Sequence, residues 1–329
     1  MSPISVRGLT KMSLKMILLP PGYHPDWPER IRTAVPGAEV KAIADPKDAF
    51  RDIKDADCAY GDVPAELFAC AKRLRWIQCY AAGPDPSFYH EALVKSDVVV
   101  TNFRGIYNDH VGQHAVTFLL ALARHLPQYM TQQSQQQWAS GKAAVYLPER
   151  VVVIVGVGGI GTEVARLCKC LGAFTIGLDP RRKNKPDFLD ELYGPEKLDD
   201  LLRKADFVVI TTPETPQTRG MMNSKRFELM KSGSFLINVG RGACVFLDDL
   251  VAALRSGKIA GAGLDVFETE PLPPDHPLWR IPNVLITPHV AAEKAPHLAE
   301  RRTQIVLENC RRFARGESLL NVVDKQNRF

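Results

Sequence analysis

The stretch VVVIVGVGGIGTEVARLCKCLGAFTIGLD, residues 151–179, decides the fold. Its first five residues, Val151–Val155, are apolar and β-branched, which is typical of a short buried strand. A glycine-rich turn follows, then residues of helical periodicity over Ile160–Leu171 and a second apolar run over Phe174–Leu178. The order strand, turn, helix, strand predicts the start of a parallel α/β sheet.

The turn has the spacing G-x-G-x-x-G, formed by Gly156, Gly158 and Gly161. The first glycine permits a tight turn, the second lets the backbone approach a pyrophosphate, and the third lets the helix pack closely on the strand. Phosphate charge would then meet N–H groups at the start of the helix, around Gly159 and Ile160. Glycine turns also occur for packing alone, but here strand, turn and helix agree, so the pattern predicts dinucleotide binding.

The choice of dinucleotide depends on the residues after the second strand. Asp179 ends this strand, where a carboxylate accepts hydrogen bonds from ribose hydroxyls and repels a 2′-phosphate, which favours NAD. Arg181, Arg182 and Lys183 follow at once, and they form either a cradle for a 2′-phosphate or a solvated basic turn. We therefore expect NAD as the cofactor, with NADP as the alternative.

Composition is that of an ordinary enzyme. The 329 residues, 45% of them hydrophobic, are enough for two domains with cores of their own. A net charge of +5, spread along the chain, gives no reason to expect nucleic acid as a partner. The apolar run Met16–Leu19 stops at Pro20 and is too short for a signal peptide or a membrane span. The seven cysteines lack metal or disulfide spacing, which favours reduced thiols and a cytoplasmic location.

Two histidines, His110 and His114, lie four positions apart on a long amphipathic segment that begins at Asp109 and that we expect to bridge the two domains. Such a pair is a possible metal site, but no third ligand or general-base glutamate accompanies it. We favour helix-surface or interdomain histidines, and we predict no metal.

Short apolar segments alternate with helical stretches such as Ala65–Lys72 in the N-terminal part of the chain, which predicts a first parallel α/β domain. These segments are Lys15–Leu19, Glu39–Ala44, Ala56–Tyr60, Trp76–Cys79 and Val98–Val100. A glycine turn, Tyr80–Asp85, follows the fourth of them. It either holds a small anion on backbone N–H groups near Ala82 and Gly83, or only ends the strand.

Residues capable of chemistry follow the strands predicted after the glycine loop. These strands are Phe207–Thr211, Ser234–Val239, Gly261–Leu264 and Val284–Thr287. The residues that follow them are Thr212, Pro213, Arg241, Asp265, Glu270 and His289. Ligands of open α/β sheets bind outside the carboxyl ends of the strands, so we expect these residues to converge on the cofactor, with Thr212 and Pro213 in contact with it.

Arg241, Glu270 and His289 suit a single site. Arg241 lies between Gly240 and Gly242, which would leave its guanidinium open to a ligand, and its planar fork of donors fits a carboxylate. His289 can exchange a proton with a substrate oxygen, and Glu270 is the candidate for stabilising the protonated ring and fixing its tautomer. Taken singly, they are equally well a surface arginine, a solvated acid and a loop histidine. Their position after successive strands favours one site.

The chain resembles the D-isomer-specific 2-hydroxyacid dehydrogenases from about Ala56 to Asp324. The glycine loop carries the similarity together with INVGRG at 237–242, GLDVFETEP at 263–271 and TPH at 287–289. The resemblance implies that Arg241 binds the substrate carboxylate and carbonyl, and that His289 is the acid/base with Glu270 as its partner. It also places Asp265 near the nicotinamide.

The family fold implies two Rossmann-like domains with doubly wound parallel sheets, the cofactor domain being inserted in a discontinuous, flavodoxin-like substrate domain. A last helix, predicted at Glu300–Phe313 and followed by Gly316, would return to the first domain. We therefore expect a substrate-binding domain at 1–108 and 297–329 and an NAD(P)-binding domain at 109–296. Members of the family pair through their cofactor domains, so we expect a homodimer with contacts around Gln128–Trp138.

The implied reaction is hydride transfer between a nicotinamide cofactor and a small 2-oxo acid or D-2-hydroxy acid, with glyoxylate or hydroxypyruvate as the expected substrate. Similar 3-phosphoglycerate dehydrogenases have an Arg-Ser pair where this chain has Gly61-Asp62, whose acid would repel a phosphate. Similar formate dehydrogenases have Gln in place of Glu270. The alternatives are a bulkier 2-oxo acid, an inorganic anion such as phosphite, and an NAD(H)-sensing protein like the C-terminal-binding corepressors. A panel of substrates separates them.

Overall fold

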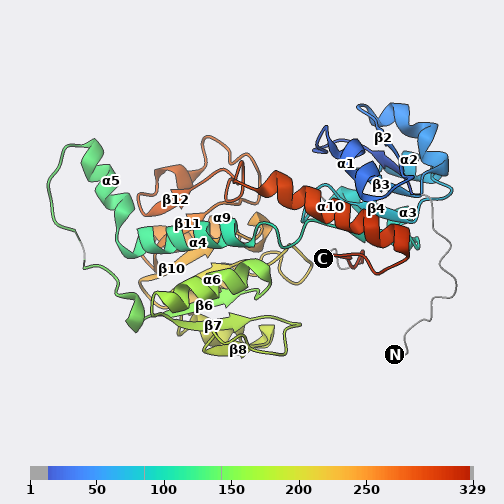
Figure 1. Ribbon diagram of the computed structural model, residues 1–329. Helices are drawn as coiled ribbons and strands as arrows, with labels where there is room; N and C mark the ends of the chain where they lie inside the picture. The colour runs from blue at the N-terminus through green and yellow to red at the C-terminus, as the bar shows by residue number, and fades with distance from the viewer. Residues whose placement is uncertain (1–13, 85, 142, 327–329) are drawn as a thin grey trace. The chain divides into compact units, whose positions relative to one another are not determined.

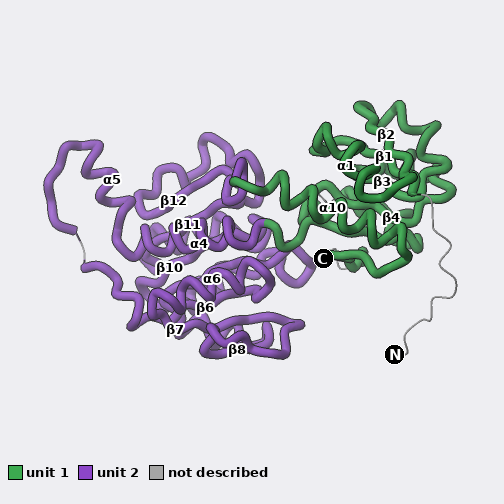
Figure 2. The backbone as a smooth tube through the Cα atoms, viewed as in Figure 1, with its two compact units in different colours: residues 1–106, 296–329 green, residues 107–295 purple. Residues whose placement is uncertain are grey.

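The computed structural model describes residues 14–84, 86–141 and 143–326, so that Asp85 of the predicted anion-binding turn lies outside the described residues. The chain divides into two compact units (Figure 2). Unit 1 comprises residues 1–106 and 296–329, and unit 2 comprises residues 107–295. Unit 1 is thus discontinuous in sequence. The boundaries predicted from the sequence lie one or two residues further along the chain.

Unit 1 contains a five-stranded parallel sheet of order β2-β1-β3-β4-β5. Its strands are β1 (Lys15–Leu18), β2 (Glu39–Ala42), β3 (Cys58–Tyr60), β4 (Trp76–Gln78) and β5 (Val99–Thr101). Its helices are α1 (Trp27–Ala34), α2 (Ala65–Cys70), α3 (Glu91–Lys95) and α10 (Leu298–Arg315). This strand order is the flavodoxin-like one, so the predicted fold of the first domain is confirmed.

The returning helix α10 is part of the core of unit 1. It packs against α1, where the indole N–H of Trp27 donates a 2.8 Å hydrogen bond to Thr303 Oγ1, and both side chains are buried. The helix ends at Gly316, whose φ of +68° is a left-handed conformation that favours glycine. The predicted helix is therefore correct, and it extends two residues further at each end.

Unit 2 contains a seven-stranded parallel sheet of order β12-β11-β10-β9-β6-β7-β8 (Figure 1). Its strands are β6 (Val151–Val155), β7 (Phe174–Leu178), β8 (Glu191–Tyr193), β9 (Phe207–Ile210), β10 (Ser234–Asn238), β11 (Ile259–Leu264) and β12 (Val284–Ile286). Its helices are α4 (Asn108–Ala123), α5 (Leu126–Ser134), α6 (Gly159–Cys170), α7 (Leu198–Leu202), α8 (Ser224–Leu229) and α9 (Leu247–Arg255). The order reverses between β6 and β9, which is the switch point where Rossmann folds bind dinucleotides.

The sheet of unit 2 is buried on both faces. Along β6, Val153 and Val155 belong to the core on one face, and Val152 and Ile154 to the core on the other. A strand covered on both sides can be apolar at every position, which explains the uninterrupted run VVVIV. In the part of the chain that the structure describes, no helix is both long and apolar enough to cross a membrane.

Helix α4 approaches this sheet unusually closely. A Cβ atom placed on Gly263 of β11 would lie 2.7 Å from Cβ of Phe118, and one on Gly261 would lie 3.1 Å from Cδ2 of Leu122. The two glycines therefore form a shallow surface on β11 that accepts the side chains of Phe118 and Leu122. These residues lie four apart on α4 and hence on the same face of the helix.

Candidate active site

The carboxyl ends of β10, β11 and β12 are aligned in unit 2. Asn238 pairs in register with Leu264, and Leu264 pairs with Ile286. The backbone ladder continues one step beyond the strands, since Asp265 N–H donates to Asn238 O and Thr287 N–H donates to Leu264 O. The loops that carry Arg241, Glu270 and His289 therefore leave one edge of the sheet from neighbouring strands, as the sequence predicts.

His289 and Glu270 form a direct pair. The distance between His289 Nδ1 and Glu270 Oε2 is 2.7 Å, and the other carboxylate oxygen of Glu270 accepts a 2.9 Å hydrogen bond from Phe267 N–H. The imidazole is half exposed, at 51% of its side-chain surface. Because the carboxylate accepts from Nδ1–H, the other ring nitrogen, Nε2, is left to face a ligand. Among the described residues, Nε2 has no hydrogen-bond partner.

Arg241 is half-buried in the turn after β10, where Asn238 Nδ2 donates to its carbonyl and its own Nη1 donates to Gly240 O. The sequence-based explanation for its flanking glycines needs correction. A Cβ on Gly240 would lie 2.6 Å from Thr212 O, and one on Gly242 would lie 1.9 Å from the backbone of Phe267. The glycines are required because the turn is packed between two other backbone segments, and this requirement is independent of any ligand.

Asp265 is buried, and its carboxyl group is fully used inside the protein. One oxygen accepts from Thr287 Oγ1 at 2.6 Å and from Val290 N–H at 2.9 Å, and the other accepts from Ala291 N–H at 3.1 Å. These bonds hold the segment that contains His289. The proximity of Asp265 to a nicotinamide stays a prediction.

The glycine loop between β6 and α6 is shaped for close approach. Gly156 has φ of +96°, and a Cβ on Gly161 would lie only 1.9 Å from Gly156 O, so both positions exclude a side chain. A Cβ on Gly158, by contrast, meets no described atom within 4 Å, and this residue caps α6 without a side chain. The loop thus leaves open space directly at a helix N-terminus, which fits a pyrophosphate. A Cβ on Gly159 would clash with the side chain of Asn108.

The remaining residues assigned to the cofactor surround this loop. Ile160 is partly buried against the core of unit 2. Thr212 is buried, with its hydroxyl 3.5 Å from the sulfur of Cys244, and Pro213 O accepts a 2.7 Å bond from Thr218 Oγ1. The segment Thr212–Pro213 follows β9, the strand beside β6 at the switch point.

Asp179 has a different environment from the one expected for a ribose ligand alone. Its Oδ2 accepts from Val157 N–H of the glycine loop at 3.0 Å, and its Oδ1 accepts from the N–H groups of Arg181 and Arg182, both at 2.9 Å. The carboxylate therefore joins the glycine loop to the basic turn that follows β7. These three backbone hydrogen bonds of Asp179 were not predicted from the sequence.

Two turns singled out from the sequence lie in unit 1: Gly61-Asp62 after β3, and Ala82-Gly83, predicted to hold the substrate anion on backbone N–H groups, after β4. Gly61 has φ of +106°, and burial raises the pKa of the adjacent Asp62 carboxyl above its ordinary value. Ala82 O accepts a 2.8 Å bond from Asn102 Nδ2, which fixes the course of the second loop, and Gly83 is exposed. Ala82 and Gly83 thus belong to unit 1, whereas Arg241, Glu270 and His289 belong to unit 2.

One contact at the site went unnoticed in the sequence. His114 Nε2 lies 2.9 Å from Thr287 Oγ1, so this histidine is a neighbour of the segment that carries His289. The signal was present, because His114 is one helical turn before Phe118 and on the same face of α4. Within residues 14–84, 86–141 and 143–326, no group of three or more His, Cys, Asp or Glu side chains is arranged to hold a metal ion.

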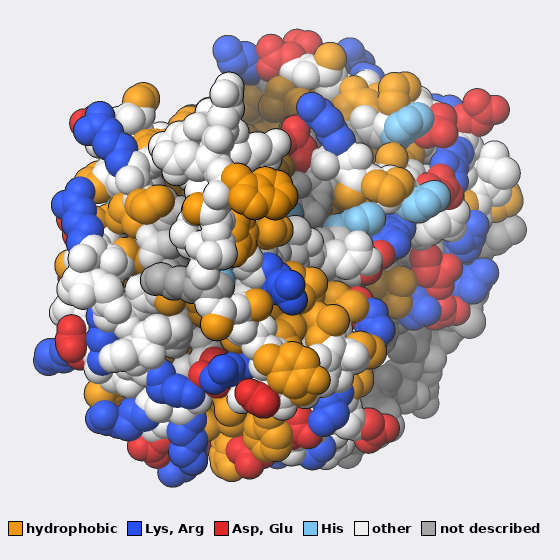
Figure 3. All heavy atoms as spheres, turned by 90° about the vertical axis from the view of Figure 1, so that its left-hand side faces the viewer, with side chains coloured by type: hydrophobic (Ala, Val, Ile, Leu, Met, Phe, Trp, Pro, Cys, Tyr) orange, Lys and Arg blue, Asp and Glu red, His pale blue; other side chains and the backbone are white. Residues whose placement is uncertain are grey.

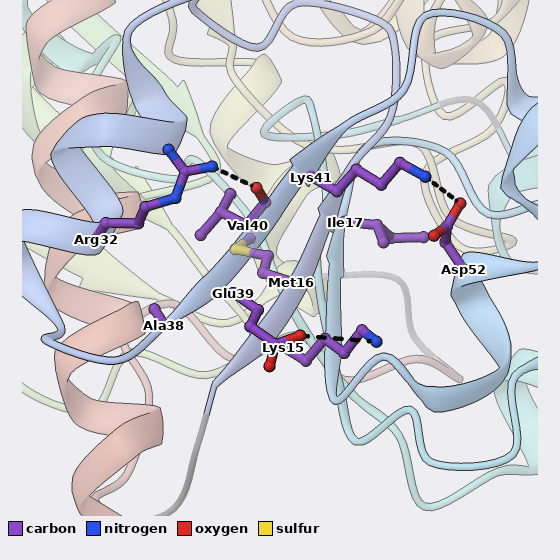
Figure 4. A pocket seen from close by; sticks show the side chains of 9 residues that line it. All are labelled: Lys15, Met16, Ile17, Arg32, Ala38, Glu39, Val40, Lys41 and Asp52. Carbon is purple, nitrogen blue, oxygen red and sulfur yellow. Dashed lines mark hydrogen bonds and ion pairs between the residues drawn. The ribbon is translucent and has the colours of Figure 1, made fainter.

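A surface groove in unit 1 contains none of these residues. It lies along the edge strand β2, and its charged groups are paired with one another (Figure 4). Lys41 Nζ lies 2.7 Å from Asp52 Oδ2, Lys15 Nζ lies 3.7 Å from Glu39 Oε2, and Arg32 donates to Val40 O. Charged side chains of this kind protect an exposed edge from pairing with another strand.

The Rossmann sheet, the open glycine loop and the histidine–glutamate pair are the combination expected of a nicotinamide-dependent dehydrogenase. The model of the D-isomer-specific 2-hydroxyacid dehydrogenase NAD-binding domain matches residues 116–291. A glyoxylate reductase of Korarchaeum cryptofilum is 35% identical over 286 residues, which are 83% of this chain and 84% of that protein. The chain belongs to the D-isomer-specific 2-hydroxyacid dehydrogenase family.

Solved structures of the same family match nearly the whole length of this chain. A family member from Xanthobacter autotrophicus, in complex with NADPH and MES, is 30% identical with a TM-score of 0.81, and the match covers 97% of this chain and all of that one. An NADPH-dependent glyoxylate/hydroxypyruvate reductase from Sinorhizobium meliloti, in complex with NADP and sulfate, gives the same identity, TM-score and coverage.

The protein is therefore an oxidoreductase that uses NAD(P) and transfers a hydride between this cofactor and a small 2-oxo acid or D-2-hydroxy acid. The predicted family, fold class, type of enzyme and cofactor class are confirmed. The alternative of an NAD(H)-sensing protein is not favoured, because these relatives are reductases and dehydrogenases.

Proposed function

We propose that this enzyme reduces glyoxylate or hydroxypyruvate, using His289 as proton donor. The observation that carries the proposal is the 2.7 Å bond between His289 Nδ1 and Glu270, on the same sheet edge as Arg241. Two relatives named glyoxylate reductase, at 35% and 32% identity, support the choice of substrate, as does the glyoxylate/hydroxypyruvate reductase of S. meliloti.

The roles of the three side chains follow from their chemistry. Arg241 holds the substrate carboxylate through two parallel hydrogen bonds and stabilises charge that develops on the keto oxygen. When bound, the nicotinamide supplies the hydride for the keto carbon. His289 donates a proton from Nε2 to the oxygen, and Glu270 keeps the ring oriented and favours its protonated form. In the reverse direction, neutral His289 accepts the proton of the hydroxyl group.

We assign part of the substrate contacts to unit 1, and cofactor binding to unit 2, which also carries Arg241 and His289. In unit 1 the N–H groups near Ala82 and Gly83 hold the substrate anion, and the acid at Asp62 disfavours a phosphorylated substrate. In unit 2 the loop from Gly156 to Gly161 holds the pyrophosphate, with Thr212, Pro213 and Asp265 also at the cofactor. The open position at Gly158 supports this assignment.

For the cofactor, we propose NADPH in preference to NADH, the alternative that the sequence leaves open beside NAD. Asp179 already accepts three backbone hydrogen bonds, and two of them come from the basic residues Arg181 and Arg182. The carboxylate thus fixes the start of a turn that presents Arg181, Arg182 and Lys183 close to the ribose position. Related structures in complex with NADPH or NADP support the choice.

We propose that the enzyme is a homodimer that pairs through the segment around α5, residues 126–138. This segment exposes large apolar side chains: Leu126 (46%), Met130 (63%) and Trp138 (104%). Figure 3 shows hydrophobic side chains gathered on the face of unit 2 that carries α5. A groove lined by Leu122, Pro127, Val145 and Phe235 lies beside it in the same unit, and a second copy is the proposed occupant.

We also propose a cytoplasmic location. All seven cysteines are free, and five of them are buried. Burial raises the pKa of Cys79 and of Cys168 to about 12, so these thiols stay protonated. A chain with this set of unpaired thiols suits a reducing compartment.

The test of the proposed function is the loss of nicotinamide absorbance at 340 nm with NADPH and NADH as probes. We would supply glyoxylate, hydroxypyruvate, pyruvate, a branched 2-oxo acid and phosphite in parallel, with phosphite assayed in the direction of reduction of NADP. We expect the highest kcat/KM with glyoxylate or hydroxypyruvate and NADPH. Turnover confined to phosphite or to the branched acid would contradict the proposed substrate. A preference for NADH would contradict the proposed cofactor.

A further inference from the structure

A chain of hydrogen bonds connects helix α4 to the segment that carries His289. His114 Nε2 lies 2.9 Å from Thr287 Oγ1, and Thr287 Oγ1 lies 2.6 Å from Asp265 Oδ1. Thr287 directly follows β12, and His289 is two residues further on. His114 Nε2 also lies 3.6 Å from Asp265 Oδ1, and the side chains of His114 and Asp265 retain only 21% and 2% of their surface, against 51% for His289.

The direction of the bonds follows from the donors available. A carboxyl group that already accepts from Val290 N–H and Ala291 N–H takes the hydroxyl proton of Thr287 as a further donor. The Thr287 oxygen is then an acceptor toward α4, so His114 presents Nε2–H to it. His114 therefore donates in this contact whatever the state of its Nδ1.

The segment that this chain holds is conformationally demanding. His289 has φ of +55°, a left-handed conformation that is uncommon for a side chain other than glycine. Its N–H donates both to Asp265 O at 2.8 Å and to Thr287 O at 3.0 Å. The backbone of His289 is thus fixed by the carbonyl groups of Thr287, which contacts α4, and of Asp265, which accepts from Thr287. A strained conformation persists only where its surroundings determine it.

The position of His114 is itself determined by packing. Its ring contacts the ring of Phe118 edge to face, with 4.6 Å between centroids, and Phe118 lies over Gly263 of β11. Gly263 pairs with Leu285 of β12, the strand that leads into Thr287. The packing of Phe118 on Gly263 therefore fixes the position of α4 relative to that strand. A rigid helix and a rigid sheet edge therefore meet at the hydroxyl of Thr287.

We propose that His114 is a positioning residue for His289, which acts through Thr287 and Asp265. This inference rests on the proposed role of His289 as proton donor. The Nε2–H of His114 orients the Thr287 hydroxyl toward Asp265, and the oriented carboxyl group holds Val290 and Ala291, the two residues after His289. Loss of the donor lets the segment relax, which displaces the imidazole from the substrate oxygen.

The test compares substitutions that remove the hydrogen bond with substitutions that keep it. His114→Leu keeps apolar contact with Phe118 but has no donor, and Thr287→Val keeps the shape without the hydroxyl. We expect kcat for glyoxylate reduction to fall about ten- to hundredfold in both, because small displacements of reacting groups are costly. The dissociation constant of NADPH, measured by fluorescence, should stay within about twofold. His114→Gln and Thr287→Ser, which restore a donor and a hydroxyl, should recover most of kcat.

Thr117→Val is the matched control, since Thr117 is exposed on α4 and its hydroxyl donates to Gln113 O of the same helix. This variant should keep wild-type kcat. The double variant His114→Leu/Thr287→Val should lose no more kcat than Thr287→Val alone, because the two groups act in series. Additive losses, or no rescue by Thr287→Ser, would show that the residues act only by packing.

Two further measurements distinguish a folding defect from a slower chemical step. Thermal unfolding within about 3 °C of wild type would show that His114→Leu remains folded. The isotope effect with NADPH deuterated at the transferred position should rise in His114→Leu, since the chemical step becomes slower. If His289→Ala abolishes reduction while His114→Leu and Thr287→Val turn over normally, this inference is wrong and the proposed function stands. If His289→Ala retains turnover, the proposed function itself fails.

Discussion

At the scale of single residues, the pair Glu270 and His289 gives the sharpest expectation. Glu270→Gln removes the charge but keeps an oxygen that can accept from Phe267 N–H, as Oε1 of Glu270 does. The neutral amide no longer stabilises the protonated ring, so we expect kcat/KM for reduction to fall about ten- to hundredfold. The dissociation constant of NADPH should be unchanged. Stopped-flow kinetics and fluorescence titration measure the two quantities.

A matched control for this substitution is Glu268→Gln. Glu268 accepts a 2.7 Å bond from Leu247 N–H at the start of α9 and does not contact His289. It lies two residues from Glu270, so a general disturbance of the loop would affect both variants. If Glu268→Gln lowers kcat/KM as much as Glu270→Gln, the special role of the pair is untenable.

Asp179 gives a second expectation at this scale. In Asp179→Ala, the N–H groups of Val157, Arg181 and Arg182 lose their acceptor together. Both the glycine loop and the basic turn are released, so we expect NADH and NADPH to bind more weakly by similar factors, about tenfold each. Isothermal titration with the two cofactors measures this. A loss confined to NADH would instead identify Asp179 as a ribose ligand only.

Residue positions were predictable from sequence where they depend on strand ends, and residue contacts were not where they depend on neighbouring backbone. Glu270 and His289 follow successive strands, so their meeting could be expected. The glycines beside Arg241 could not be interpreted correctly, because the segments at Thr212 and Phe267 that exclude a side chain are distant in sequence. The bond from Val157 N–H to Asp179, across 22 positions, was hidden for the same reason.

At the scale of elements, the contact of α4 with β11 is the most testable feature. Gly263→Ala places a methyl group 2.7 Å from Cβ of Phe118, closer than side chains tolerate. The helix must shift, and overpacking of this kind costs about 1–3 kcal/mol. We expect the free energy of unfolding in urea to fall by this amount, with a loss of kcat because His114 shifts as well.

Compensation tests the cause of that loss. Phe118→Ala leaves a cavity, and a methyl group on Gly263 partly fills it. In the Phe118→Ala background, Gly263→Ala should therefore cost less than in the wild type. An equal cost in both backgrounds would place the strain elsewhere on β11.

Elements with strong apolar patterns were predicted to within a residue or two, since burial on both faces leaves a clear signal. Strands β6 and β7 have the predicted bounds. Strand β8 was missed, because it has three residues at the sheet edge and is only partly buried. A short polar edge strand has no hydrophobic pattern to detect.

At the scale of the whole molecule, the discontinuity of unit 1 could not be derived from local pattern. Helix α10 is amphipathic, but its own sequence does not indicate which of the two sheets it covers. The buried bond between Trp27 and Thr303, residues 276 positions apart, settles that α10 belongs with α1. Only the resemblance to a family suggested this arrangement in advance.

The proposed homodimer leads to the last expectation. Met130→Glu places a charge on the exposed face of α5, and Trp138→Ser removes the most exposed aromatic side chain of the segment. In a two-fold interface each change occurs twice, so like charges and lost apolar contacts weaken the dimer from both sides. Sedimentation velocity should show the wild type at twice the chain mass of 36.5 kDa and the double variant at the mass of one chain.

Phe50→Ser, an exposed position of unit 1, is the control and should leave the dimer intact. A wild-type protein that sediments as a single chain at micromolar concentration, or a double variant that still pairs, would show that residues 126–138 do not form the interface.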